Sequence, residues 1–205
     1  MLERKGFDKW ADRYDRDVGL SDIRNSYPFA GYGKVLDAVE KLVEEKGCRD
    51  VLDLGFGTGE LTARLYDKGC TVAGQDFSPE MVKTAQAKMP DALLVCGDIA
   101  KGLASSLQQK TYDAVIMTYF IHHLSDVRKH ELLKDLQGRL NEGGMIIIGD
   151  VAFETRQDLE DCRTFEGGAW DDEEVYIAAD ELKQVFPDLV FTKMSYCAGL
   201  ITIGK

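Results

Sequence analysis

The feature of the sequence that most constrains its fold is an alternation of short apolar runs with helical stretches. The apolar runs have the length of strands and lie at residues 51–55, 71–76, 92–98, 112–120 and 144–150. The intervening stretches carry apolar side chains at the three- and four-residue spacing of a helix, at residues 58–69, 78–89 and 125–140. This alternation predicts an α/β fold, a doubly wound and mostly parallel sheet with helices on both faces.

Capping residues support these boundaries. Ser78 precedes Pro79 and Ser125 precedes an acidic residue, which is typical of helix starts. After residue 150 the pattern changes, and we expect a short helix near 178–186 followed by two apolar runs, 189–198 and 200–205. Because these runs are separated only at Gly199, too short a connection for a parallel crossover, they should form an antiparallel hairpin at one edge of the sheet.

The 205 residues suit a single domain. We expect an aromatic-rich helical cap over residues 1–45, a cofactor-binding core over 46–150, and a substrate-side segment with the hairpin over 151–205. The acidic stretch around Trp170 is interpreted as a solvated loop, or alternatively as a lid over the substrate.

Charge and composition exclude several classes of protein. A formal net charge of −11 disfavours binding to nucleic acid, whose phosphates attract Lys and Arg. The apolar runs are too short to span a membrane, and the N-terminus lacks the apolar core of a signal peptide. Five scattered cysteines form neither a disulfide framework nor a metal-ligand spacing. We therefore expect a cytoplasmic protein without a metal site; its oligomeric state is not indicated.

Asp53 stands two residues before a glycine-rich turn, GFGTG, that joins a predicted strand to a predicted helix. Gly55 and Gly57 would let a ligand approach the backbone, whereas Gly59 would allow close packing of the helix against the sheet. The turn departs from the dinucleotide fingerprint because Glu60 replaces its third glycine. Since Asp53 and Glu60 add negative charge where a pyrophosphate would bind, the turn favours a ligand with a cationic part, S-adenosylmethionine (SAM).

Two more carboxylates end the second and third predicted strands, where a doubly wound sheet binds ligands. Asp76 can accept hydrogen bonds from both ribose hydroxyls, and Phe77 after it is also assigned to the cofactor site. Asp98 can accept from the adenine amine, with the N–H of Ile99 reaching a ring nitrogen. Asp98 could instead serve only as a helix N-cap.

Five segments resemble successive motifs of class I SAM-dependent methyltransferases: VLDLGFGTG, VAGQDFSPEM, CGDI, YDAVIMTYFIHHL and LNEGGMIIIGD. The resemblance covers about residues 7–150, and the terminal hairpin is similar to the family's antiparallel seventh strand. FDKWADRYD and TYFIHHL are most similar to an uncharacterised bacterial YrrT-type branch. The resemblance implies a Rossmann-like, seven-stranded sheet of order 3-2-1-4-5-7-6. It also implies that Asp53, Gly55, Gly57, Asp76 and Asp98 occupy cofactor-binding positions.

The acceptor side of the site is less well determined. Tyr119 ends the fourth predicted strand and is a candidate contact for cofactor or acceptor. His122 and His123 are candidates for a substrate contact or a general base, and simple packing of the rings is the alternative interpretation. Tyr14 shares a helix face with Trp10 and could contact the sulfonium, or merely help to dock that helix on the sheet.

These features predict a methyltransferase that transfers the sulfonium methyl group of SAM by in-line displacement to a small-molecule acceptor, leaving S-adenosylhomocysteine (SAH). Two alternatives remain open. An NAD-dependent oxidoreductase would share the fold but leaves Glu60 and Asp98 unexplained. A non-catalytic module that binds SAM or SAH would share the binding motifs.

Overall fold

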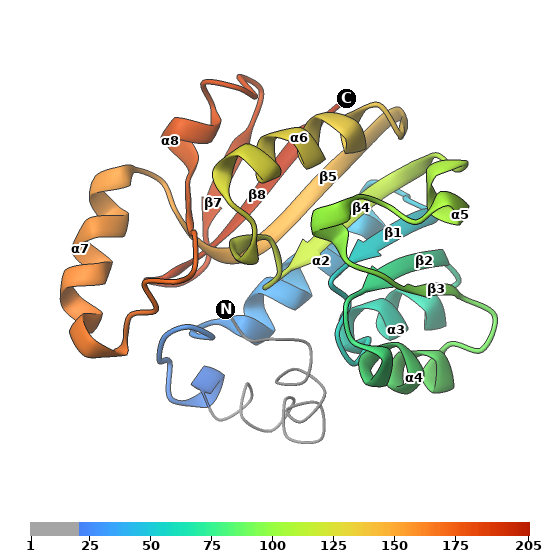
Figure 1. Ribbon diagram of the computed structural model, residues 1–205, viewed down its shortest axis with the longest axis horizontal. Helices are drawn as coiled ribbons and strands as arrows, with labels where there is room; N and C mark the ends of the chain where they lie inside the picture. The colour runs from blue at the N-terminus through green and yellow to red at the C-terminus, as the bar shows by residue number, and fades with distance from the viewer. Residues whose placement is uncertain (1–20) are drawn as a thin grey trace.

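The computed structural model describes residues 21–205 and contains one twisted mixed sheet of order β3-β2-β1-β4-β5-β8-β7 (Figure 1). The strands are β1 (Asp50–Leu54), β2 (Thr71–Asp76), β3 (Leu93–Cys96), β4 (Tyr112–Thr118), β5 (Leu140–Phe153), β6 (Ile177–Ala178), β7 (Val190–Lys193) and β8 (Ala198–Gly204). Strands β1 to β5 pair in parallel, and β8 is antiparallel to β5 and to β7. The expected order is thus confirmed, with the two-residue β6 added beside β5.

Helices cover both faces of the sheet. They are α2 (Tyr32–Glu45), α3 (Glu60–Asp67), α4 (Pro79–Lys88), α5 (Ser105–Gln108), α6 (Asp126–Gln137), α7 (Arg156–Glu166) and α8 (Ala179–Leu182), with short 3-10 turns η1 (Ile99–Lys101), η2 (Ile121–His123) and η3 (Gly167–Ala169). Side chains of α2, α3, α4 and α7 form one core, and those of α5, α6 and α8 form the other. Within residues 21–205, no helix has the length and apolar character needed to cross a membrane.

The strands alternate between these two cores. In β1, Val51 belongs to the α2 side and Leu52 to the α6 side, and in β4 the same holds for Ile116 and Val115. A strand buried on both faces reads as a continuous apolar run, which is why the sequence pattern located these strands. Because β1 to β5 are parallel, their carboxyl ends meet at one edge, where the predicted site residues lie.

Local capping determines where the helices begin. Ser78 accepts a hydrogen bond from the N–H of Met81, and Ser125 caps α6 in the same way, as predicted. Helix α3 begins at Glu60 because Gly59 before it is left-handed, with φ 78°. Helix α7 was not predicted, although Thr155 and Asp158 form a reciprocal capping box that the sequence displays.

The predicted antiparallel hairpin is present, but the predicted position of its turn is wrong. Gly199 lies inside β8, paired with Lys193, and the connection spans residues 194–197. A methyl group on Gly199 would lie 2.3 Å from the ring of Phe191. This glycine therefore makes room for an aromatic side chain of β7. A glycine between two apolar runs is also typical of a turn, which is why the sequence pattern misplaced the connection.

Gly149 of β5 provides a test of how closely α2 packs against the sheet. A methyl group there would lie 2.3 Å from Cγ1 of Val35 on α2. We expect Gly149→Ala to lower the free energy of unfolding by about 1–3 kcal/mol through overpacking, as measured by urea denaturation. Gly204→Ala, where the added methyl meets no described atom within 4 Å, is the matched control. Adding Val35→Ala to Gly149→Ala should recover part of the lost stability. If the destabilisations of the two single variants simply add in the double variant, this packing model is contradicted.

Candidate active site

The three glycines of the turn after β1 have different surroundings. All three are left-handed, with φ of 75° at Gly55, 55° at Gly57 and 78° at Gly59. A methyl group on Gly59 would press on Ala85 of α4 and on Met89 just after this helix, so Gly59 permits close packing against a neighbouring helix and not, as predicted, against the sheet. One on Gly55 would collide with the ring of Phe120, whereas one on Gly57 would meet no described atom within 4 Å. The Cβ side of Gly57 is thus open, whereas that of Gly55 is covered by Phe120.

Asp76 joins this turn to the end of β2. Its Oδ2 accepts a hydrogen bond from the N–H of Gly57 at 2.9 Å, and its Oδ1 accepts one from the N–H of Ser78 at 2.9 Å. The carboxyl group is buried, and burial raises its pKa. Because a carboxylate already occupies the N–H of Gly57, this amide is poorly placed to receive a phosphate. Each carboxylate oxygen retains acceptor capacity for a further donor such as a hydroxyl.

Asp53 lies beneath the same turn. The side chain is 1% exposed, and its Oδ2 accepts a hydrogen bond from the hydroxyl of Thr62 on α3 at 2.5 Å. Its other oxygen, Oδ1, is buried without a hydrogen-bond partner among the described residues. Burial raises the pKa of Asp53 to about 7, although the Thr62 bond opposes this shift. The first carboxylate of the motif therefore links β1 to α3 inside the core, and its Oδ1 has no partner among the described residues.

The remaining predicted cofactor positions lie on the same edge. Phe77 is 38% exposed, directly after Asp76. Asp98 accepts a hydrogen bond from the N–H of Ala100 at 3.0 Å, so the N-cap role considered above is present. Ile99 is buried at the start of η1. Glu60 is paired with Arg64 at 2.8 Å, which weakens its contribution to the charge of the turn; Asp53 and Asp76 remain the acidic groups that line it.

The end of β4 carries a cluster of aromatic rings. Tyr119 is buried in a left-handed conformation, with φ 48°, which is strained for a residue other than glycine. Its ring lies 5.3 Å from that of Phe29 and 5.1 Å from that of Tyr32, between ring centroids. The other predicted aromatic contact, Tyr14, falls outside the described residues, as does Trp10 on the same predicted helix face.

Asp150, near the end of β5, organises the turn that follows β4. Its Oδ2 accepts hydrogen bonds from the N–H groups of Phe120 at 3.2 Å and Ile121 at 3.1 Å. Its Oδ1 lies 2.6 Å from Nδ1 of His122. Burial tends to lower the pKa of His122, but the charge of Asp150, its hydrogen bond to the ring and the charge of Glu174 together outweigh burial, so the net shift is upward. Asp150 is the last residue of the predicted strand 144–150, and no local pattern links it to its partners, which lie 28 to 30 residues away.

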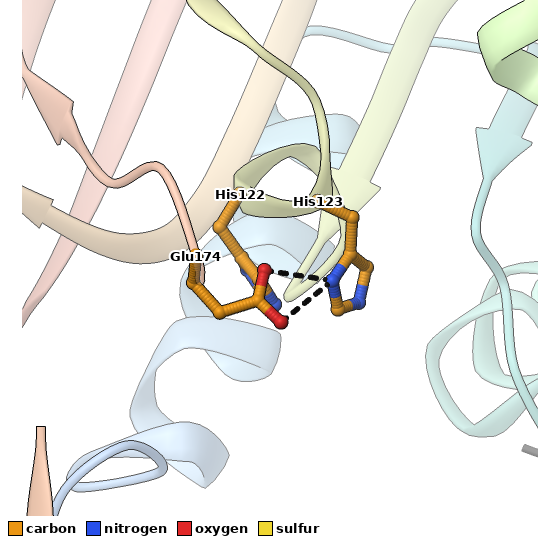
Figure 2. A group of neighbouring side chains, drawn as sticks. All are labelled: His122, His123 and Glu174. Carbon is orange, nitrogen blue, oxygen red and sulfur yellow. Dashed lines mark hydrogen bonds and ion pairs between the residues drawn. The ribbon is translucent and has the colours of Figure 1, made fainter. Parts of the chain in front are cut away.

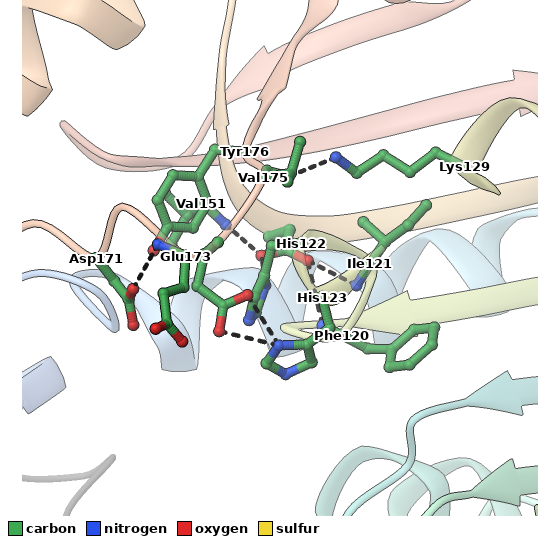
Figure 3. Close-up of polar contacts among 12 residues, drawn as sticks. Phe120, Ile121, His122, His123, Lys129, Val151, Asp171, Glu173, Val175 and Tyr176 are labelled. Atoms are coloured by element: carbon green, nitrogen blue, oxygen red, sulfur yellow. Dashed lines mark hydrogen bonds and ion pairs between the residues drawn. The ribbon is translucent and has the colours of Figure 1, made fainter. Parts of the chain in front are cut away.

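His123 faces a residue from a distant loop. Its Nδ1 lies 2.9 and 3.1 Å from the two carboxylate oxygens of Glu174 (Figure 2). The backbone next to Glu174 is fastened to the same turn, because the N–H of Val175 donates to the carbonyl of His122 at 2.9 Å (Figure 3). The acidic stretch before it is exposed at residues 171–173, as expected of a solvated loop.

Trp170 itself is half-buried in an aromatic cluster. Its ring stacks on Tyr27 with a centroid distance of 5.3 Å and lies edge-on to Tyr176 at 4.9 Å. Tyr176 in turn lies 5.9 Å from the His122 ring and shares a short hydroxyl contact with Tyr27. The loop expected to be solvated therefore contributes one anchored aromatic side chain, Trp170, which packs on the Tyr176 ring next to His122.

Comparison with known proteins places this arrangement in a family. Residues 51–144 match the model of a methyltransferase domain. An uncharacterised methyltransferase of Geobacillus sp. (strain WCH70) is 35% identical over 194 residues, which cover 91% of this chain and 88% of the relative. The chain belongs to the class I SAM-dependent methyltransferases. The uncharacterised methyltransferase YrrT of Bacillus subtilis (strain 168) is 36% identical over 152 residues, covering 74% of this chain and 68% of YrrT.

Solved structures confirm the fold of this methyltransferase. The magnesium protoporphyrin IX methyltransferase ChlM of Synechocystis PCC 6803, with bound SAH, superposes with a TM-score of 0.73 at 19% identity, covering 98% of this chain and 97% of ChlM. The plantazolicin methyltransferase BpumL superposes with a TM-score of 0.63 at 17% identity, covering 98% and 95%. SAM is the methyl donor of the family, which disfavours the NAD-dependent alternative.

The buried position of Asp53 predicts a pH dependence of stability. Its pKa is about 7 in the folded protein against an ordinary 3.8, so the folded state retains the proton to higher pH. The free energy of unfolding should then fall as pH rises from about 4 to about 7, and it should level off above that. This group contributes at most about 4 kcal/mol to the fall. Asp53→Asn removes the titrating group.

Denaturant unfolding at pH 4.5 and 7.5, without cofactor, measures this effect. The loss of stability between the two pH values should be smaller in Asp53→Asn than in the unmodified protein. Because other groups also titrate, the comparison uses the difference between the two proteins. Equal losses in both would show that the Asp53 carboxyl is solvated.

Proposed function

We propose that this methyltransferase transfers the methyl group of SAM to a small-molecule acceptor held at the carboxyl end of β4. The observation that carries the proposal is the hydrogen bond between the Gly57 N–H and Asp76, which brings an approachable glycine turn and the acid of the second strand together. This arrangement offers acceptors for the hydroxyls of a nucleoside, and it leaves the Gly57 amide already paired and not free for a phosphate.

The residues present fit a cationic nucleoside. Burial raises the pKa values of both Asp53 and Asp76, so a positive charge placed beside them would stabilise their ionised forms. The buried Oδ1 of Asp53 supplies an acceptor without a partner among residues 21–205. We propose that the donor is held by Asp53, Gly55, Gly57, Asp76, Phe77, Asp98 and Ile99, with Tyr119 and Tyr14 toward its methyl group.

When bound, SAM supplies a methyl group that its positively charged sulfur already activates. The chain therefore needs no nucleophile of its own, and its residues have to orient two reactants and exclude water, which can contribute up to ~7–11 kcal/mol. The rings of Phe29 and Tyr32 pack on Tyr119 at the end of β4, and we propose that this aromatic cluster helps to exclude water from the site. His122 and His123 line the acceptor side, where either could contact the acceptor or accept its proton.

The charge of the chain supports a small acceptor over nucleic acid. The net charge of −11 opposes nucleic-acid substrates, and the acidic residues 171–173 lie beside the histidine turn. Structural neighbours include enzymes named for magnesium protoporphyrin IX and for plantazolicin, so the fold itself accommodates acceptors of different shape. All five cysteines are free thiols, which supports a cytoplasmic location.

Calorimetric titration of Asp76→Ala with SAM tests the site. We expect most of the SAM affinity to be lost, because the proposed acceptor of the ribose hydroxyls is removed. Asp67→Ala, at the exposed far end of α3, is the matched control and should bind normally. Since Asp76 also secures Gly57, the melting temperature of each variant without ligand must be compared. A folded Asp76→Ala protein with unchanged SAM binding would overturn the assignment.

Measuring SAH production distinguishes a catalytic methyltransferase from a module that only binds SAM. A panel of small hydroxyl, amine and thiol acceptors should yield SAH above the rate without acceptor for at least one class. Tight SAM binding with no turnover across the panel would favour a non-catalytic binding role.

A further inference from the structure

Two elements far apart in sequence bring three metal-ligating side chains together beside the proposed acceptor site. His122 and His123 come from η2, and Glu174 lies in the loop before β6, 51 residues from His123. One ligand atom from each lies within 4.8 Å of the other two (Figure 2). All three side chains are half-buried, so they are shielded from bulk water but can still be reached.

Asp150 holds His122 in an orientation suited to a metal ligand. The Oδ1 atom of this fully buried carboxylate lies 2.6 Å from Nδ1 of His122. Metal-ligating histidines typically donate one ring N–H to such a carboxylate, which fixes the ring and presents the other nitrogen to the metal. Nε2 of His122 is therefore the nitrogen available for coordination.

The loop that carries Glu174 is anchored to the histidine turn. The N–H of Val175 donates to the carbonyl of His122 at 2.9 Å, and the buried ammonium of Lys129 donates to the carbonyl of Val175 (Figure 3). These backbone contacts hold the Glu174 carboxylate against His123 independently of the bond between the two side chains. Pre-positioning of this kind distinguishes the cluster from a chance pair of surface charges.

We propose that His122, His123 and Glu174 bind one divalent transition-metal ion of the class of Zn²⁺, Fe²⁺ or Co²⁺. Two imidazoles and a carboxylate suit these ions, whereas Mg²⁺ and Ca²⁺ prefer oxygen ligands alone. Bonds of about 2.1 Å in tetrahedral geometry place ligand atoms about 3.4 Å apart, so small side-chain rotations suffice to close the site. Three protein ligands leave a coordination position for water or a small donor molecule.

The sequence did not predict this site because the ligands do not form a local spacing motif. Adjacent histidines are a weak signal, and the carboxylate comes from a loop interpreted as solvated. The proposal concerns metal binding by the described residues and does not depend on the identity of the methyl acceptor.

Cobalt titration of the chelator-treated, tag-free protein tests the proposal. We expect visible Co²⁺ absorption that saturates at one ion per chain and disappears when Zn²⁺ is added. His123→Ala and Glu174→Gln should each weaken Co²⁺ binding at least about 100-fold, since loss of an outer-shell partner already costs roughly 10–100-fold. Asp150→Asn should weaken Co²⁺ binding by an amount within that range of roughly 10–100-fold.

Matched controls lie close by. His130→Ala removes the chain's third histidine, and Glu173→Gln changes the exposed carboxylate next to Glu174. Both should bind Co²⁺ like the unmodified protein. Circular dichroism and melting without metal identify any variant that fails to fold, in which case the other of His123→Ala and Glu174→Gln decides the result.

The proposal is overturned if the unmodified protein shows no saturable Co²⁺ absorption. It is also overturned if folded His123→Ala and Glu174→Gln proteins bind as tightly as the two controls. SAM titration of the same metal-free samples reports on the proposed function separately, because it needs neither metal nor acceptor.

Discussion

The architecture of the site depends on buried carboxylates that accept backbone N–H groups at the carboxyl edge of the sheet. Strands end there and leave amides without partners in the ladder, and such groups are costly to bury unpaired. Asp76 accepts from Gly57 and Ser78, and Asp150 accepts from Phe120 and Ile121. These two acids therefore shape the turns that follow β1, β2 and β4, on which both halves of the proposed site are built.

The same carboxylates determine the electrostatic character of the crevice. Asp53 and Asp76 are both buried, and burial raises both pKa values; the charge of Asp76 raises the pKa of Asp53 further. A neutral or anionic ligand would leave in place the free-energy cost of ionising these buried carboxyl groups, whereas a cationic nucleoside would offset it. The membership of the chain in the SAM-dependent methyltransferases agrees with this electrostatic selection.

The acceptor side follows a different principle, in which one turn is held by two later segments. Asp150 fixes the His122 ring, while Val175 and Glu174 hold the turn from the opposite side. Tyr119 remains strained at the strand end with its ring packed on Phe29 and Tyr32. The restraints converge on a small volume at the end of β4, where the proposed acceptor and metal positions are adjacent.

The sequence by itself determined the strands other than β6, most of the helices, the sheet order through family resemblance, and the positions of Asp53, Asp76 and Asp98 near the carboxyl ends of β1, β2 and β3. These follow from periodic burial and local capping, which each segment carries in its own residues. Only the tertiary structure distinguished the open Gly57 from Gly55, which Phe120 covers, placed Gly199 inside β8, and brought Glu174 to His123. Those outcomes depend on side chains from distant segments that meet only after the sheet has assembled, so no local pattern encodes them.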